Sequence, residues 1–219
     1  MNRIGIFGGT FNPIHNGHLI VAEEVKERFG LNKICFVPAY LPPHKSAQSL
    51  IPASDRLRMV EMAVADNPGF GCSRVEIERK GLSFSIDTVR YFREKEKGEI
   101  SFILGADAFV EIESWQETEK LFSLCRFIVL TRPGTKPEEQ EERIRLLKEK
   151  YRFDFCHLTN GDNQKIDRYQ VVLVNCLLLD ISSSYIRKKS ARRGSIKYLV
   201  PHKVEKYIRE NRLYINGQS

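Results

Sequence analysis

The sequence predicts an α/β protein whose parallel sheet is covered by helices on both faces. Short apolar runs alternate at close intervals with stretches of helical periodicity along the chain. The runs are apolar at nearly every position, which is typical of strands buried on both faces. A chain of 219 residues can bury a sizeable core. We therefore expect one domain over residues 1–219, with ligands bound at the carboxyl ends of its strands.

Apolar runs and turn residues define the elements of the first half. A strand at 3–7 ends at two glycines, and a strand at 34–37 leads into a loop rich in Pro and Lys that reaches residue 53. Helical spacing of apolar residues predicts a helix between these strands that stops at Gly30, and another that Ser54 caps. The other elements expected here are a strand at 75–77, a helix at 86–95 and a strand at 100–104.

The second half continues the alternation of helices and strands. Two short helices are expected at 106–112 and 117–124, because each carries apolar residues on one side, and an apolar strand at 127–130 follows. A highly charged helix at 138–150 has apolar residues on its inner side only. The run at 169–179 is apolar almost throughout and predicts a buried strand. Helices at 183–189 and 201–211 close the chain.

Composition excludes several classes of protein. Hydrophobic residues are 42% and charged residues 29% of the chain, so it is neither disordered nor collagen-like. The five cysteines form no Cys-x-x-Cys pair, which favours reduced thiols, and a reducing cytoplasm, over disulfides or zinc. No apolar run approaches the roughly 20 residues that span a bilayer, so we expect no membrane segment.

The charge is concentrated at the C-terminal end. Residues 181–219 hold ten basic and two acidic side chains, whereas the rest of the chain is close to neutral. This basic piece is expected to form a helical C-terminal subdomain. Its charge suggests an anionic partner, and a solvated basic surface explains it equally well.

The strongest motif follows the first strand, over residues 8–18. Gly8 and Gly9 allow the backbone to approach a ligand closely, and the helix that opens at Gly17 offers free N–H groups to an anion. His15 and His18 are three residues apart, so both imidazoles can reach one point. A zinc site would need further ligands. The spacings of a dinucleotide fingerprint and of a Walker A loop are absent.

Two segments resemble the T/H-x-G-H nucleotidyltransferase superfamily. His15-Asn16-Gly17-His18 resembles its signature tetrad, and residues 181–187, Ile-Ser-Ser-Ser-Tyr-Ile-Arg, resemble its C-terminal motif, about 165 residues further on. The resemblance implies transfer of a nucleotide from a triphosphate to a phosphate, with release of pyrophosphate. It also implies a Rossmann-like, doubly wound parallel sheet with helices on both faces and a small C-terminal helical piece.

Further segments resemble one branch, the bacterial nicotinate mononucleotide adenylyltransferases. They are Pro-Pro-His-Lys at 42–45, Ser-Phe-Ser-Ile-Asp-Thr at 83–88, Gly-Ala-Asp at 105–107 with the later Trp115, and the segments 198–201 and 211–214. Nothing matches between about 135 and 165. Asn12 stands where many relatives have Asp. The implied reaction makes nicotinate adenine dinucleotide and pyrophosphate from ATP and nicotinate mononucleotide, in NAD biosynthesis.

Such a reaction needs positioning more than acid–base chemistry. The attacking phosphate is already ionised at neutral pH, so the obstacle is to bring two anions together and stabilise the charge that develops. The resemblance implies catalytic roles for His15, His18, Arg187 and Lys45. It implies binding of ATP and its phosphates by Gly8, Gly9, Thr10, Phe11, Gly17, Gly105, Asp107, Ile181, Ser182 and Ser183. Mg²⁺ would enter with ATP, so no separate protein metal site is expected.

The nicotinate mononucleotide needs its own pocket. A pyridinium ring is attracted to an aromatic face, and Trp115 is the single tryptophan. The resemblance implies that the ring stacks there and that His44, Ser83, Phe84 and Ser85 complete the pocket, where a carboxylate would be favoured over a carboxamide. Ordinary structural roles also exist: a lone Trp often belongs to the core, Asp107 can cap a helix, and His44 can be a simple loop residue.

Several alternatives stay open. Nicotinamide mononucleotide or another phosphate acceptor would use the same catalytic residues, although Trp115 and residues 83–88 do not resemble phosphopantetheine adenylyltransferases. A nucleic-acid-binding protein could use the basic C-terminal piece, but no aromatic and basic strand motif supports that reading. A silent nucleotide sensor is a further possibility. We expect no nucleic-acid or membrane partner, and a homo-oligomer is compatible with the sequence.

Overall fold

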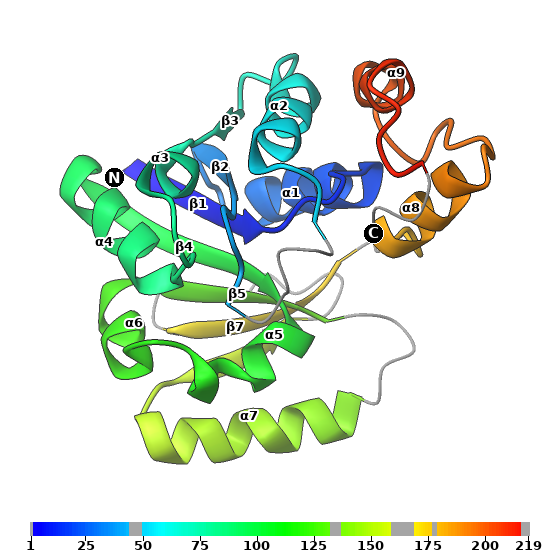
Figure 1. Cartoon of the computed structure of the whole chain (residues 1–219). Coiled ribbons are helices and arrows are strands. Elements are labelled where there is room, and N and C mark those ends of the chain that lie inside the picture. Colours follow the sequence, from blue (N-terminus) through cyan, green and yellow to red (C-terminus); the bar gives the residue numbers. More distant parts are fainter. Residues whose placement is uncertain (1, 44–49, 132–136, 159–168, 177–178, 216–219) are drawn as a thin grey trace.

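The centre of the molecule is an all-parallel sheet. The computed structural model describes residues 2–43, 50–131, 137–158, 169–176 and 179–215. Within them the sheet has seven strands in the order β3-β2-β1-β4-β5-β7-β6 (Figure 1). The strands are β1 (Asn2–Gly9), β2 (Lys33–Pro38), β3 (Phe70–Cys72), β4 (Gly98–Gly105), β5 (Arg126–Thr131), β6 (Phe155–Leu158) and β7 (Val171–Asn175).

The strand order creates a switch point between β1 and β4. From β1 the chain builds β2 and β3 outward on one side, and from β4 it builds the remaining strands on the other side. β1 pairs with β4 in parallel, with Phe7 opposite Ile103. Loops leaving two neighbouring strands in opposite directions open a crevice at their carboxyl ends. The predicted α/β class with a doubly wound parallel sheet is therefore confirmed.

Helices cover both faces and divide the core in two. One apolar cluster combines α1 (Asn16–Arg28), α2 (Ala53–Val64), α8 (Ser183–Ala191) and α9 (His202–Glu210). The other combines α4 (Ser85–Lys95), α5 (Ala106–Val110), α6 (Thr118–Leu124) and α7 (Pro137–Tyr151). Neighbouring residues of β1 belong to different clusters, Ile6 to the second and Phe7 to the first, because successive side chains of a strand point to opposite faces.

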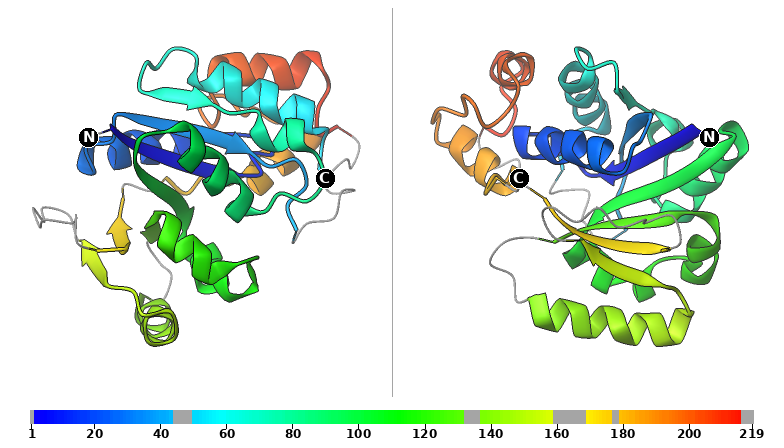
Figure 2. Two further views of the ribbon diagram at one scale, coloured as in Figure 1. Left: turned by 90° about the vertical axis from the view of Figure 1, so that its left-hand side faces the viewer. Right: turned by 180° about the vertical axis from the view of Figure 1, so that it is seen from behind.

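The C-terminal helices pack against the N-terminal half. Figures 1 and 2 show α9 beside α2, and α8 beside the start of α1. The Asn16 backbone N–H donates to the Leu199 carbonyl at 2.9 Å, and the Asn16 side chain donates to the Tyr198 carbonyl at 2.7 Å. Lys203 pairs with Asp66 at 2.8 Å. The basic piece is thus attached to the loop and helix that follow β1.

The structure corrects several expected elements. Residues 75–77 are not a strand but part of helix α3 (Val75–Arg79), and the third strand is Phe70–Cys72. Three alternating residues suit a strand or a helical turn equally, and here the Glu78 N–H bonds to the Arg74 carbonyl, 2.8 Å away. Strand β6 was not expected, because its run is short. Pro52, not Ser54, precedes the first turn of α2.

Other boundaries differ by a few residues. Of the described residues in the expected strand at 169–179, Val171–Asn175 form β7, and the expected helix at 106–112 divides into α5 and the short helix η2 (Ile112–Ser114). The five cysteines are free thiols, three of them buried. Burial raises the pKa of Cys35 to about 11. Among the described residues, no helix combines the length and the apolar character needed to cross a membrane.

Candidate active site

The loop after β1 is shaped by close contacts of its glycines. A Cβ on Gly9 would lie 2.9 Å from the Phe11 ring, and a Cβ on Gly8 would lie 3.1 Å from the Phe102 ring. Phe11 is buried and has φ 47°, so the chain turns sharply and brings this ring back over Gly9. The backbone of residues 8–10 therefore borders the crevice between β1 and β4 with no side chain at its two glycines.

The two histidines of the motif lie against each other at the start of α1. Their rings stack with centroids 3.6 Å apart and planes inclined by 26°. The His15 backbone N–H donates to His18 Nδ1 at 3.2 Å, so a neutral His18 carries its proton on Nε2. The edges of Phe7 and Phe11 also contact the His18 ring. A Cβ on Gly17 would lie 3.1 Å from His15 Nδ1, so a larger residue would disturb the pair.

The second motif docks on the first at the start of α8. The Ser182 hydroxyl caps α8 by accepting the Tyr185 N–H, while Ser183 Oγ donates to the Pro13 carbonyl at 2.8 Å. Arg187 donates to the Asn12 carbonyl at 2.9 Å, and among the described residues its buried Nε has no acceptor. Segments far apart in sequence therefore place imidazole and guanidinium groups at one end of the crevice.

Arg56 is a positioning residue that sequence reasoning missed. Its side chain is 1% exposed, and its N–H groups donate to four carbonyls: Thr10 at 2.8 Å, Ala39 at 2.5 Å, Tyr40 at 2.8 Å and Ile51 at 3.3 Å. Burial lowers the pKa of this guanidinium. Arg56 thus fixes the loop after β1 to the loop after β2. An arginine on an otherwise apolar helical face is the signal that could have revealed it.

A cavity of about 310 Å³ lies at the carboxyl ends of β1 and β4. Its walls include Gly8, Gly9, Thr10, Ser83, Phe84, Ser85, Gly105 and Trp115, eight of the residues singled out from the sequence. Phe102 and Leu104 line it as well. Aromatic and small residues therefore enclose a space that is open at its mouth to the loop after β1.

Trp115 forms one wall of this cavity and is half-buried. Its ring meets Phe102 edge to face, with centroids 6.1 Å apart. The Thr118 hydroxyl donates to the Trp115 carbonyl at 3.0 Å. Trp115 both packs on the core and borders the cavity, so a structural role in the core is compatible with a role in binding a ring.

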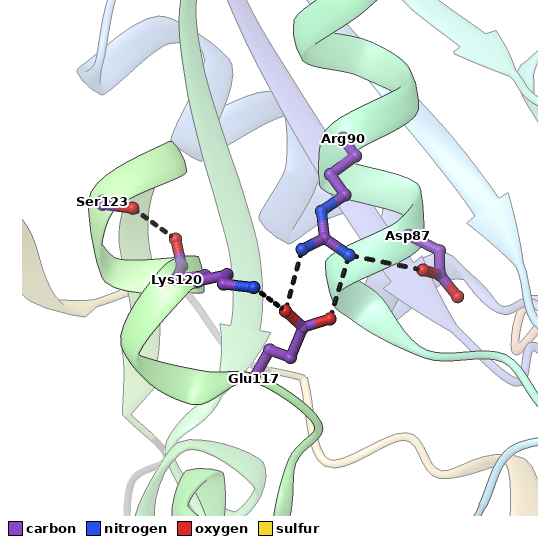
Figure 3. Close-up of polar contacts among 5 residues, drawn as sticks. All are labelled: Asp87, Arg90, Glu117, Lys120 and Ser123. Atoms are coloured by element: carbon purple, nitrogen blue, oxygen red, sulfur yellow. Dashed lines mark hydrogen bonds and ion pairs between the residues drawn. The ribbon is translucent and has the colours of Figure 1, made fainter.

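An ion-pair network ties the Trp115 turn to α4 (Figure 3). Arg90 of α4 donates from two nitrogens to the two Glu117 oxygens, both at 2.9 Å, and Lys120 pairs with the same carboxylate. These contacts, the Arg90 hydrogen bond first, lower the pKa of Glu117 to about 2. Glu117 has φ 52°, a conformation that this double contact holds in place.

Not every predicted residue joins this cavity. Asp107 is exposed in the first turn of α5 and is not part of its wall, and Gly105, not Asp107, precedes that helix. His15, His18 and Arg187 form the separate cluster at the starts of α1 and α8, where Ile181 lies 3.8 Å from a Cβ placed on Gly17. His44 and Lys45 lie outside the described residues. Within the described part of the chain, no three His, Cys, Asp or Glu side chains are grouped to hold a metal ion.

Solved structures with the same fold include adenylyltransferases. A Plasmodium falciparum nicotinic acid mononucleotide adenylyltransferase complexed with NaAD superposes with a TM-score of 0.72, covering 98% of each chain at 21% sequence identity. The same protein complexed with APC gives a TM-score of 0.70. At this level of identity the likeness establishes the fold.

Curated relatives are similar over the whole chain. A protein of Geotalea uraniireducens is 43% identical over 215 residues, 97% of this chain and 98% of the relative. A protein of Citrifermentans bemidjiense is 41% identical over 218 residues, 99% of this chain and 100% of the relative. Both carry the name probable nicotinate-nucleotide adenylyltransferase. The family model described as cytidylyltransferase-like matches residues 6–189, and the chain therefore belongs to the cytidylyltransferase-like family of nucleotidyltransferases.

Proposed function

We infer that this protein is a nicotinate-nucleotide adenylyltransferase. It transfers AMP from ATP to nicotinate mononucleotide and releases pyrophosphate. Full-length relatives at about 40% identity carry this name. The observation that supports it most is local: Phe7 lines the aromatic-walled cavity and also meets the His18 ring, with centroids 6.1 Å apart, so the cavity adjoins the histidine pair. In this proposal the ring of the mononucleotide occupies the cavity and its phosphate lies toward His15, His18 and Arg187.

The reaction is an in-line exchange at the α-phosphorus of ATP. An oxygen of the mononucleotide phosphate forms a bond to that phosphorus, and the bond from it to the pyrophosphate oxygen breaks. The attacking oxygen is already deprotonated at neutral pH, so no side chain has to remove a proton. Catalysis then depends on alignment and on charge stabilisation.

The cluster of His15, His18 and Arg187, called the phosphate end from here on, supplies that stabilisation in the proposal. The Nε2–H of His18 donates to a triphosphate oxygen, and the N-terminal end of α1, whose Asn16 N–H is already bonded to the Leu199 carbonyl, adds its positive dipole. Arg187 donates to the Asn12 carbonyl and contacts Ser184 Oγ, and its fixed positive charge stabilises the transferred phosphate. Lys45 adds a further positive charge from its loop. His15 holds His18 in place through the backbone hydrogen bond and the stacked ring.

The cavity bordered by Trp115, called the ring end from here on, selects the phosphate acceptor. Trp115 stacks on the pyridinium, and Phe84 and Phe102 complete an apolar wall. The ring carboxylate is held by Ser85 and by backbone N–H groups at the start of α4, which no described side chain caps. A carboxamide carries no charge and forms weaker hydrogen bonds there, so the acid is preferred at least about tenfold.

Magnesium accompanies ATP in this proposal. The described groups of the phosphate end are imidazole and guanidinium, which are poor ligands for a hard cation, so phosphate oxygens and water would supply most of its coordination. Bound in this way, Mg²⁺ neutralises charge on the triphosphate and on the leaving pyrophosphate. A single domain over 1–219 acting in the cytoplasm completes the proposal, and the free, mostly buried thiols suit a reducing compartment.

The test is pyrophosphate release by the purified protein with ATP and Mg²⁺. Nicotinate mononucleotide and nicotinamide mononucleotide are compared across concentrations. We expect turnover with the acid and at least about tenfold lower kcat/KM with the amide. A preference for the amide would keep the catalytic residues and overturn the ring pocket. No release with either would contradict the function and favour another phosphate acceptor or a nucleotide sensor.

A further inference from the structure

A buried carboxyl group forms part of the wall of the ring cavity. Glu76 lies in the first turn of α3, is 6% exposed and lines the cavity together with Ser83 and Phe84. Burial raises the pKa of Glu76 above its ordinary value. The charged groups that act on it are Arg79 on the same helix, Asp87 on α4 and Arg56 on α2. Placing a carboxyl here is costly, and an apolar side chain of similar size would be cheaper to bury.

Glu76 accepts a hydrogen bond from a hydroxyl group of α4. Thr88 Oγ1 donates to Glu76 Oε1 at 2.5 Å, and both residues are buried. Ser83, which also lines the cavity, accepts the Tyr40 backbone N–H at its Oγ, 2.9 Å away. The Glu76 carboxyl therefore joins α3 to the first turn of α4.

These bonds fix the segment that leads into α4. The Ser83 backbone N–H donates to the Leu41 carbonyl at 2.9 Å, and Ser83 Oγ accepts the Tyr40 N–H. Thr88, one turn into α4, is held by the Glu76 carboxyl. The segment is thus attached both to the loop after β2 and to α3. Its conformation determines where Phe84, Ser85 and the first N–H groups of α4 face the cavity.

We propose that Glu76 is a positioning residue for the mononucleotide pocket, acting through Thr88 on the residues that meet the pyridine carboxylate. The inference rests on the proposed function and deepens it. Glu76 touches no reacting atom. It holds the first turn of α4 through Thr88, so that the substrate carboxylate is met by Ser85 and by backbone N–H groups. Without Glu76, the Thr88 hydroxyl loses its acceptor and the start of α4 loses its attachment to α3.

The experiment measures nicotinate mononucleotide binding and turnover separately. Trp115 is the single tryptophan, so quenching of its fluorescence by the mononucleotide reports the Kd without any catalytic step. We expect Glu76→Ala to raise both this Kd and the KM for the mononucleotide about tenfold. The KM for ATP and kcat should change less than about threefold. Glu76→Gln, which keeps one acceptor oxygen, should recover part of the loss.

Two further variants separate this role from a general loss of stability. Glu78→Ala removes an exposed carboxylate from the same helix and should bind and turn over like the wild type. The pair Glu76→Ala and Thr88→Val should be non-additive, because both changes remove the same hydrogen bond. Additive effects would overturn the proposal. So would parallel losses in kcat and in both KM values, or wild-type affinity in Glu76→Ala with its fold intact.

Failure of the proposed function has a different signature. A wild-type protein that neither turns over nicotinate mononucleotide nor shows quenching by it would contradict the activity, and the role of Glu76 with it. Wild-type turnover and quenching together with an unaffected Glu76→Ala variant would overturn the role of Glu76 alone. Circular dichroism and thermal unfolding of each variant establish that it is folded before either conclusion is drawn.

Discussion

The phosphate end and the ring end of the crevice are built in different ways. At the phosphate end, two histidines three positions apart, joined by a backbone hydrogen bond at the start of α1, combine with Arg187, which α8 places on the Asn12 carbonyl. At the ring end, α3, α4, β4 and the Trp115 turn each contribute one part of a single cavity. An anion can be bound by a few charged groups close to one helix start, whereas a ring needs a cavity whose shape several elements assemble.

This difference has an energetic consequence. The phosphate end acts through charges and dipoles whose benefit grows as charge develops in the transition state. The ring end acts through aromatic area and a few hydrogen bonds, which are formed equally in the ground state. Changes at the phosphate end should therefore affect kcat, and changes at the ring end should affect the affinity for one substrate.

His18→Ala is expected to have the largest effect. Removing the Nε2–H donor at the start of α1 should lower kcat by about 10²–10³-fold, because such donors stabilise developing charge. Steady-state pyrophosphate release at saturating ATP and mononucleotide measures it. His202→Ala, an exposed histidine on α9, is the matched control and should retain wild-type turnover. A near-normal kcat for His18→Ala would contradict the proposal that the phosphate end stabilises charge in the transition state.

Arg56 joins the two ends, so its loss should affect both. Arg56→Met leaves four carbonyl groups without their donor and should lower the free energy of unfolding by about 3 kcal/mol. Urea denaturation followed by circular dichroism measures this. The KM values for ATP and for the mononucleotide should both rise. Arg58→Met, which changes an exposed arginine on the same helix, is the control. An Arg56→Met protein as stable as the wild type would show that the four hydrogen bonds of Arg56 are not needed to hold the two loops together.

Trp115→Ala should affect the ring end alone. Loss of the aromatic face should raise the KM for nicotinate mononucleotide about tenfold or more and leave the KM for ATP within about threefold. Initial rates with each substrate varied in turn separate the two effects. Trp115→Phe should keep most of the affinity. An equal rise in the KM values for both substrates would mean that Trp115 acts only in the core. It would contradict the proposal that the two ends of the crevice bind different parts of the substrates.

The same contrast explains what the sequence could predict. The strands that form the sheet centre and the residues of the loop after β1 were identified, because apolar runs and a contiguous motif encode them locally. Strand β6, helix α3 and the clamp of Arg56 were missed, since three or four residues carry no reliable period and a buried arginine takes its meaning from carbonyls of distant loops. Glu76 was part of a misassigned strand for the same reason. The roles of the site residues, those of His44 and Lys45 included, stay predictions.

The smallest expected effect is that of Glu117 at the ring end, measured as the pH dependence of the Tm. Arg90 and Lys120 lower the pKa of Glu117 to about 2, so its ion pairs stabilise the fold fully above the unfolded pKa, about 4.3, and lose that effect as the pH falls toward 2. Glu117→Gln should lower the Tm by about 1–3 °C at pH 7, because this carboxylate is partly exposed to solvent. The difference from wild type should shrink between about pH 4.5 and 2, whereas Glu119→Gln, an exposed neighbour on α6, should show no such trend.

Because the network holds the Trp115 turn to α4, Glu117→Gln should also raise the KM for the mononucleotide slightly while kcat stays unchanged. A Tm difference independent of pH would mean that the paired charges contribute nothing, and that packing against Phe102 and the Thr118 hydrogen bond hold this wall of the cavity by themselves.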